Sequence, residues 1–190
     1  GVIPCGIPYM IQSLKTPDEN AVGMASLEKN GIEPIVDEAL SIDRKGKSVA
    51  CKSGRVWQYE KLVLAVGSAP AVPPIPGIEK QGIYPIYKEM GYLKNAIAQI
   101  KKCKNVLVVG GGFIGVEFAD ELSLSGGIRT SLVELLPAIL ANSFDREFSK
   151  LAHDKLTANG VRILTGAKVL AFSGKDRVEK AALSTGEELA

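Results

Sequence analysis

The sequence predicts an α/β protein built on a parallel sheet, and three features of its central region support this prediction. An apolar run at Asn105–Val109 has the length of a strand and ends in a cluster of glycines. A helical pattern then continues through Ser125, and a second apolar run follows at Ile128–Val133. Two apolar strands separated by one helix are typical of a parallel β-α-β unit.

The glycine cluster has the spacing of a dinucleotide-binding loop. In the pattern formed by Gly110, Gly112 and Gly115, the first glycine allows the turn, the second admits a pyrophosphate and the third brings the helix onto the strand. The start of the helix adds free N–H groups and a positive dipole end. Glu134 lies 24 residues after Gly110, near the usual place of the ribose-binding carboxylate. We therefore predict a Rossmann-like nucleotide-binding fold.

The alternative is a glycine turn that packs a helix on a strand without any ligand, because this glycine pattern alone is a weak signal. The surrounding strand, helix, second strand and acid favour a nucleotide. A carboxylate at Glu134 would repel a 2′-phosphate, and Leu135–Asn142 contains no lysine or arginine. We therefore predict NAD(H) as the ligand rather than NADP.

Composition excludes several classes of partner. The formal net charge of +2 gives no electrostatic case for nucleic acid, and no apolar run reaches the roughly 18 residues of a membrane span. The three cysteines show no CxxC spacing, which disfavours a disulfide framework or a zinc site and suits the cytoplasm. The single histidine, His153, argues against a histidine-based metal cluster, and we predict an exposed helix residue there.

Cys5 lies close to a predicted helix start. Pro8 can occupy the first turn of a helix, and the positive dipole end of a helix favours the thiolate form of a cysteine just before it. The alternative is a small buried apolar residue, and the residues alone leave both interpretations open. Met10 occupies the place of a second cysteine in a C-x4-C pair, so Cys5 has no resolving partner in this chain.

Short elements fill the region between Cys5 and the proline-rich connector Pro73–Gly77. Thr16–Asn30 has a polar helical pattern, and the continuous apolar run Lys61–Val66 predicts a strand buried on both faces. The prolines predict a domain boundary between residues 76 and 77. The other strands are expected at Ile32–Val36, Ala39–Arg44, Ser48–Cys51 and Val56–Tyr59.

The region after the connector predicts the remaining parts of the nucleotide-binding unit. Amphipathic patterns predict helices at Met90–Cys103 and Asp145–Asn159, and Gly160 ends the second. A third sheet strand is expected at Val161–Leu164, and a β-meander at Val169–Phe172 and Val178–Leu183.

Three separated motifs point to one family. They are Cys5–Tyr9 (CGIPY), Leu62–Pro76 (LVLAVGSAPAVPPIP) and Val108–Glu117 (VVGGGFIGVE). Together they resemble the flavin-dependent pyridine nucleotide-disulfide oxidoreductases, especially the single-cysteine branch of coenzyme A-disulfide reductases, NADH oxidases, NADH peroxidases and persulfide reductases. The resemblance implies FAD and NAD(H) as cofactors. It also implies a partial FAD-binding domain at 1–76, an NAD-binding domain without its last strand at 77–190, and a homodimer for the full-length protein.

The resemblance also implies roles for individual residues. Cys5 corresponds to the redox cysteine, Phe113 to the aromatic residue that covers the flavin, and Glu117 to the partner of the nicotinamide amide. The NAD site would include Gly110, Gly112, Ile114 and Gly115, with Glu134 at the ribose, and the FAD site would include Ala39, Ala65 and Gly67. Val66 stands where the family usually has threonine, which puts one hydrogen bond to FAD in question.

The implied activity is electron transfer from NADH through FAD to Cys5, and on to a disulfide, persulfide, peroxide or oxygen. An NAD-binding regulatory module without catalysis is the second hypothesis. A direct dehydrogenase is the third, although no suitable base is visible near the nicotinamide. The FAD fingerprint of the family precedes the redox cysteine, so we expect an internal piece of a longer enzyme, with little or no turnover by itself.

Overall fold

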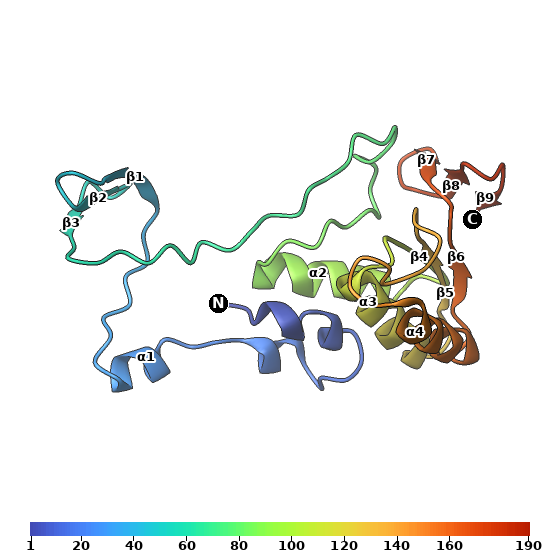
Figure 1. The fold of residues 1–190 in the computed structure, drawn as a ribbon, viewed down its shortest axis with the longest axis horizontal. Coiled ribbons are helices and arrows are strands. Elements are labelled where there is room, and N and C mark those ends of the chain that lie inside the picture. The colour runs from blue at the N-terminus through green and yellow to red at the C-terminus, as the bar shows by residue number, and fades with distance from the viewer. The chain divides into compact units, whose positions relative to one another are not determined.

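All 190 residues are described by a computed structural model, in which the chain divides into two compact units (Figure 1). The first unit contains Gly1–Val22 and Ala69–Ala190, and the second contains Gly23–Ser68. All three hydrophobic core clusters lie in the first unit. The segment with Cys5 therefore belongs to the same unit as the glycine loop, and the predicted domain division at residue 76 stays a prediction.

A parallel sheet forms the centre of the first unit, which confirms the predicted fold class. The strands lie in the order β4-β5-β6, and Asn105 pairs with Arg129 while Val109 pairs with Val133. Helices connect the strands, as a parallel arrangement requires. The bounds are β4 Asn105–Val109, α3 Phe113–Leu124, β5 Arg129–Val133, α4 Arg146–Ala158 and β6 Arg162–Leu164.

The ends of α4 follow from its sequence. The Asp145 carboxylate accepts a hydrogen bond from the Phe148 N–H at 3.2 Å, which satisfies one of the free donors at the helix start. Gly160 has a φ of +87°, the left-handed conformation in which helices commonly end. His153 lies on this helix, partly exposed beside Asp154, in agreement with its predicted surface position.

Helix α2 (Met90–Ile100) packs its apolar face into the core and begins at a side-chain cap. Leu93, Ala96 and Ile97 are buried there, as the amphipathic pattern predicted. The Glu89 carboxylate accepts hydrogen bonds from the N–H groups of Gly91 and Tyr92, at 2.8 and 2.5 Å. The bonds from Tyr92 and then Gly91 hold the pKa of Glu89 below its ordinary value of 4.5.

We expect Glu89→Gln to lower the melting temperature at neutral pH by a few degrees and to have little effect near pH 3. The pKa of Glu89 is lower in the folded state than its ordinary value of 4.5. Its contribution to the free energy of unfolding is therefore fully present above pH 4.5 and is lost as the pH falls through the pKa of the folded state. Thermal melts followed by circular dichroism test this, with Glu33→Gln at an exposed position as the control. An equal loss at both pH values would contradict the capping argument.

The C-terminal part of the first unit is an antiparallel meander. Its strands β7 (Val169–Ser173), β8 (Lys180–Leu183) and β9 (Glu188–Leu189) lie in sequence order. The connector is fixed to it, because the Phe172 N–H donates to the Pro76 carbonyl at 2.8 Å. The proline-rich segment therefore has a defined place beside the sheet.

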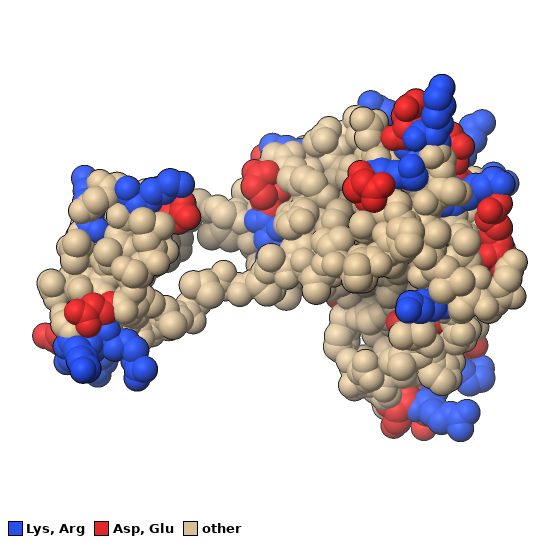
Figure 2. All heavy atoms as spheres, turned by 90° about the horizontal axis from the view of Figure 1, so that it is seen from above, with Lys and Arg blue, Asp and Glu red and all other residues tan.

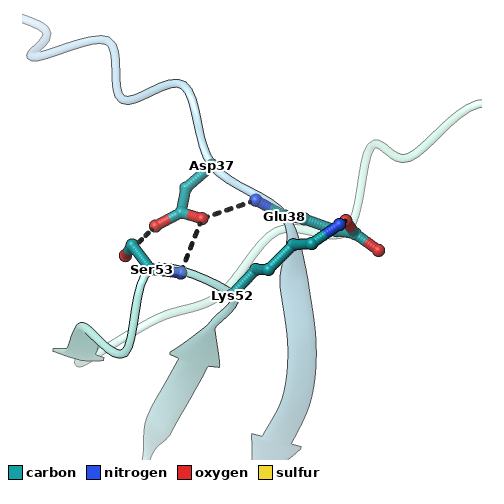
Figure 3. Close-up of polar contacts among 4 residues, drawn as sticks. All are labelled: Asp37, Glu38, Lys52 and Ser53. Atoms are coloured by element: carbon teal, nitrogen blue, oxygen red, sulfur yellow. Dashed lines mark hydrogen bonds and ion pairs between the residues drawn. The ribbon is translucent and has the colours of Figure 1, made fainter.

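The second unit contains a short helix and a three-stranded antiparallel sheet. Asp37 closes this sheet by accepting hydrogen bonds from the Ser53 hydroxyl, the Ser53 N–H and the Glu38 N–H (Figure 3). The Ser53 hydroxyl is the main cause of the lowered pKa of Asp37. The bounds are α1 Ala25–Lys29, β1 Ala39–Asp43, β2 Ser48–Cys51 and β3 Val56–Gln58.

Two predicted strands, Ile32–Val36 and Lys61–Val66, are absent from the structure. A strand needs the backbone groups of a neighbour, and β1, β2 and β3 pair only with one another. The prediction that Lys61–Val66 is buried on both faces is also wrong, since Val63 and Val66 are 84% and 88% exposed. The second unit contains no buried residue at all.

The predicted helix at Thr16–Asn30 is wrong as a single element, because the structure divides it. A 3-10 turn at Pro17–Asn20 is followed by an extended residue, Ala21, and the helix resumes only at α1. The break has a physical cause, since the Val22 N–H donates to the Gly1 carbonyl at 2.9 Å and Val2 pairs with Ala21. Pairing with the start of the chain thus competes with the helix.

The surface carries both signs of charge. On the face drawn in Figure 2, lysines and arginines lie beside aspartates and glutamates.

The longest helix, α4, has 13 residues, and no helix combines the length and the apolar character that a membrane crossing requires.

Candidate dinucleotide and thiol sites

The glycine loop between β4 and α3 has the geometry that each glycine position predicts. Gly110 has a φ of +106°, which a residue with a side chain rarely adopts. A Cβ on Gly115 would lie 1.8 Å from the Gly110 carbonyl oxygen, so only glycine allows this approach of helix to strand. A Cβ on Gly112 would meet no atom within 4 Å. The loop therefore packs closely against α3 at Gly115 and leaves open space beside Gly112.

Glu134 is held directly against this loop. Its two carboxylate oxygens accept hydrogen bonds from the Gly111 N–H at 2.5 Å and the Leu136 N–H at 2.6 Å. A carboxylate offers about four lone-pair positions, so about two remain for the hydroxyls of a ribose. The structure thus brings the predicted ribose carboxylate and the predicted phosphate loop together at one end of the sheet.

A cavity of about 300 Å³ opens at the carboxyl ends of β4 and β5. Ligands of parallel α/β sheets bind at such ends. The walls consist of connector residues on one side and strand ends on the other, namely Pro73–Ile75, Val109, Gly110, Val133–Leu135 and Ala167–Val169. The walls are mostly apolar and carry two charged residues, the fixed carboxylate of Glu134 and Lys168. Such walls fit an adenosine group, and the open side of Gly112 fits the adjoining pyrophosphate.

We expect two glycine substitutions to have different effects, one on stability and the other on NADH binding. Gly115→Ala should lower the melting temperature by about 5–10 °C, because its Cβ overlaps the Gly110 carbonyl. Gly112→Ala should lower the melting temperature by no more than about 3 °C, because its Cβ enters open space and only the helix cap is weakened. It should weaken NADH binding at least about tenfold by blocking the pyrophosphate. Calorimetry for stability and fluorescence titration for NADH separate the two effects. Unchanged NADH affinity in Gly112→Ala would contradict the predicted phosphate site.

The first two turns of α3 hold three further predicted site residues. Phe113 and Ile114 are exposed, and the Phe113 ring meets the edge of Phe144 at a centroid distance of 5.6 Å. Glu117 lies half-buried one turn further on. All three belong to the helix that begins at the loop, and their roles at the nicotinamide and flavin stay predictions.

Cys5 is an exposed free thiol, whereas Cys51 and Cys103 are partly buried. Its exposure argues against the alternative of a small buried apolar residue. The predicted helix after Cys5 is wrong in type, because the structure has only two 3-10 turns of three residues, Pro4–Gly6 and Pro8–Met10. So few aligned peptide groups give a weak dipole, so the helix-start argument for a thiolate loses its basis.

Two buried polar residues that contact the segment carrying Cys5 were not found from the sequence. Asn20, only 2% exposed, donates from its amide to the Ile3 carbonyl at 3.0 Å and to the Met10 sulfur at 3.3 Å. Glu121, only 3% exposed, accepts hydrogen bonds from Gln12 and Ser13. The one available signal was that Glu121 interrupts the apolar face of α3, three residues after Phe118 and beside Leu122.

The residues predicted to meet FAD lie in the second unit. Ala39 begins β1, Ala65 lies in the unpaired apolar run, and Gly67 has a φ of +68°. Cys5 belongs to the first unit, and the chain contains one dinucleotide fingerprint, which lies on the NAD side. Their roles at FAD therefore stay predictions.

Comparisons with known proteins agree with this geometry. The family model described as pyridine nucleotide-disulphide oxidoreductase matches residues 4–190. The NAD(P)H coenzyme A polysulfide/persulfide reductase of Pyrococcus horikoshii is 30% identical over 189 residues, which cover 97% of this chain and 42% of the relative. The chain thus spans less than half the length of this relative.

Two solved structures show the same fold. The ferredoxin reductase for the CYP199A2 system of Rhodopseudomonas palustris has a TM-score of 0.85 at 28% identity, over 96% of this chain and 46% of that one. The NAD-dependent persulfide reductase of A. fulgidus has a TM-score of 0.84 at 26% identity, over 99% of this chain and 37% of that one.

Proposed function

Because the chain belongs to the pyridine nucleotide-disulphide oxidoreductase family, we propose that it forms part of an NADH-dependent flavoprotein that reduces an acceptor through Cys5. The family assignment confirms the resemblance found in the three motifs. The acceptor class comprises disulfides, persulfides, peroxide and oxygen, and oxidised sulfur is favoured by the persulfide reductases among the relatives. We further propose a homodimer in the cytoplasm, without nucleic-acid or membrane partners.

One observation supports the NADH half most directly. The carboxylate of Glu134 is hydrogen-bonded to the glycine loop at the edge of an apolar cavity. This arrangement supports a dinucleotide site, in which the loop would bind the pyrophosphate, Glu134 the ribose and the cavity the adenine. The negative charge of Glu134 favours NADH over NADPH, since a 2′-phosphate would lie against it.

The exposure of Cys5 supports the proposed thiol chemistry. With a disulfide acceptor, the Cys5 thiolate forms a bond to one sulfur, the original S–S bond breaks, and the departing thiolate takes a proton. The two electrons of NADH then restore the Cys5 thiolate and release the second thiol, so that NADH, one proton and one disulfide give NAD⁺ and two thiols. FAD, when bound, carries the electron pair between NADH and sulfur.

A regulatory module that binds NAD without catalysis is the other candidate. Such a module needs the same loop and Glu134 but has no use for an exposed thiol. The exposure of Cys5 therefore favours the redox enzyme.

The test is an anaerobic experiment on the FAD-loaded holoprotein, meaning the full-length flavoprotein of which this chain forms part. We expect NADH to bleach the visible flavin absorption, and added polysulfide or hydrogen peroxide, or readmitted oxygen, to restore it. Flavin that stays oxidised in the presence of saturating NADH would overturn the proposed enzyme and favour the regulatory module. NADPH serves as the matched control for the nucleotide and should act more slowly at equal concentration.

A further inference from the structure

The segment that carries Cys5 is attached to the nucleotide-binding helix by one buried carboxylate. Glu121 lies in the third turn of α3, and its side chain is 3% exposed. One of its oxygens accepts the N–H groups of Gln12 at 3.1 Å and Ser13 at 2.8 Å, and the other accepts the Ser13 hydroxyl. All three donors belong to the same segment, more than 100 residues away along the chain.

These hydrogen bonds fix the end of a segment whose middle is held by apolar contacts. Ile7, Met10 and Ile11 are buried in one core cluster with residues of α2 and α3, including Phe118 and Leu122. Apolar contacts are not directional, so they hold the segment on the helices without specifying how far it slides along them. A carboxylate that accepts three hydrogen bonds does specify this position.

A second restraint, independent of Glu121, acts on both sides of Cys5. Asn20 holds the Ile3 carbonyl and the Met10 sulfur, and a Cβ on Gly6 would lie 1.9 Å from the Asn20 amide oxygen. Residues before and after Cys5 are therefore both restrained, while the cysteine itself is exposed. Of the two restraints, only the one at Glu121 reaches the helix that begins at the dinucleotide loop.

We propose that Glu121 is a positioning residue that sets the place of Cys5 relative to α3 and hence to the dinucleotide bound at the start of that helix. This proposal rests on the proposed redox role of Cys5. Electron transfer to a thiol depends on alignment, and a misplacement of about 1 Å can cost about 100-fold in rate. Reduction of the flavin by NADH does not involve Cys5, so it should not depend on Glu121.

Two substitutions separate positioning from packing. In Glu121→Gln, the amide oxygen can accept both N–H groups while the amide nitrogen donates to the Ser13 hydroxyl, which can rotate to accept. This variant should keep both half-reactions within about threefold of the unsubstituted protein. Glu121→Met keeps the volume and removes every acceptor, leaving the N–H groups of Gln12 and Ser13 without this partner.

The experiment measures two rates in the FAD-loaded holoprotein, below the melting temperature of each variant. The first is flavin reduction by NADH, and the second is anaerobic turnover with whichever of polysulfide and hydrogen peroxide acts faster. We expect Glu121→Met to keep the first rate within about twofold and to lower the second by about 10- to 100-fold.

Four results would count against the inference or its premise. A Glu121→Met variant with normal acceptor turnover would overturn the positioning role, and so would equal losses in both rates, which indicate damaged folding alone. Failure of Glu121→Gln to restore turnover would also overturn it. Acceptor turnover that survives Cys5→Ser would instead overturn the proposed function, which keeps the two failures distinguishable.

Discussion

Replacement of Glu134 by alanine is expected to weaken NADH binding by about 100-fold. The carboxylate has two tasks, because it accepts hydrogen bonds from Gly111 and Leu136 and retains lone pairs for the ribose hydroxyls. Each hydrogen bond to a charged group contributes about 1.5–3 kcal/mol, and about 1.4 kcal/mol corresponds to a tenfold change in affinity. Loss of the ribose bonds and loosening of the loop together account for the predicted factor.

Isothermal titration with NADH and NADPH measures this effect. Glu134→Ala should also reduce the preference for NADH, because the charge that repels a 2′-phosphate is gone. Glu134→Gln should not rescue binding, since each carboxylate oxygen faces a different N–H donor and an amide nitrogen would face one of them. Glu147→Ala, which removes an exposed acid from α4, is the control. Unaltered NADH affinity in Glu134→Ala would refute the assignment of the cavity.

Replacement of Cys5 by serine is expected to reduce acceptor turnover by at least about 1,000-fold, because a hydroxyl forms neither the mixed disulfide of thiol-disulfide exchange nor the sulfenic acid that peroxide produces from a thiolate. NADH binding should be unchanged, since Cys5 lies outside the loop and the cavity. Steady-state turnover of the FAD-loaded holoprotein with polysulfide and with peroxide gives the measurement.

Serine substitutions of the other two cysteines provide the controls. Cys51 lies on β2, and the Cys103 thiol donates a hydrogen bond to the Gln99 carbonyl at 3.5 Å. Both cysteines therefore belong to regular elements or their ends and have no expected part in catalysis. Neither change should alter turnover by more than about twofold. Equal losses from all three substitutions would indicate a general effect of cysteine removal and no special role for Cys5.

Local patterns predicted the nucleotide-binding unit closely. The strand at Asn105–Val109 agrees at both ends, and the helix after the glycine loop ends within one residue of its predicted limit. Apolar periodicity and glycine spacing act over a few residues, so they can be read directly from the sequence. The same reasoning placed Glu134 near the loop, since both follow strands of one parallel sheet.

Features that depend on distant residues could not be predicted in this way. Lys61–Val66 has the composition of a buried strand, yet a strand also needs a neighbouring backbone. Glu121 accepts a hydrogen bond from Ser13, which is 108 residues away in the sequence, and no local pattern predicts that contact. The wall of the cavity formed by Pro73–Ile75 likewise depends on how the connector returns to the sheet.

The lack of any buried side chain in Gly23–Ser68 has a consequence for local opening. Amide protons resist exchange with deuterated solvent only as far as the surrounding structure resists opening, and side-chain burial supplies most of that resistance. The amides of β1, β2 and β3 should therefore exchange orders of magnitude faster than those of β4 and β5, although both groups of strands are paired in sheets. The parallel sheet of the first unit would then open rarely, and the sheet of the second unit would open many times for each such event.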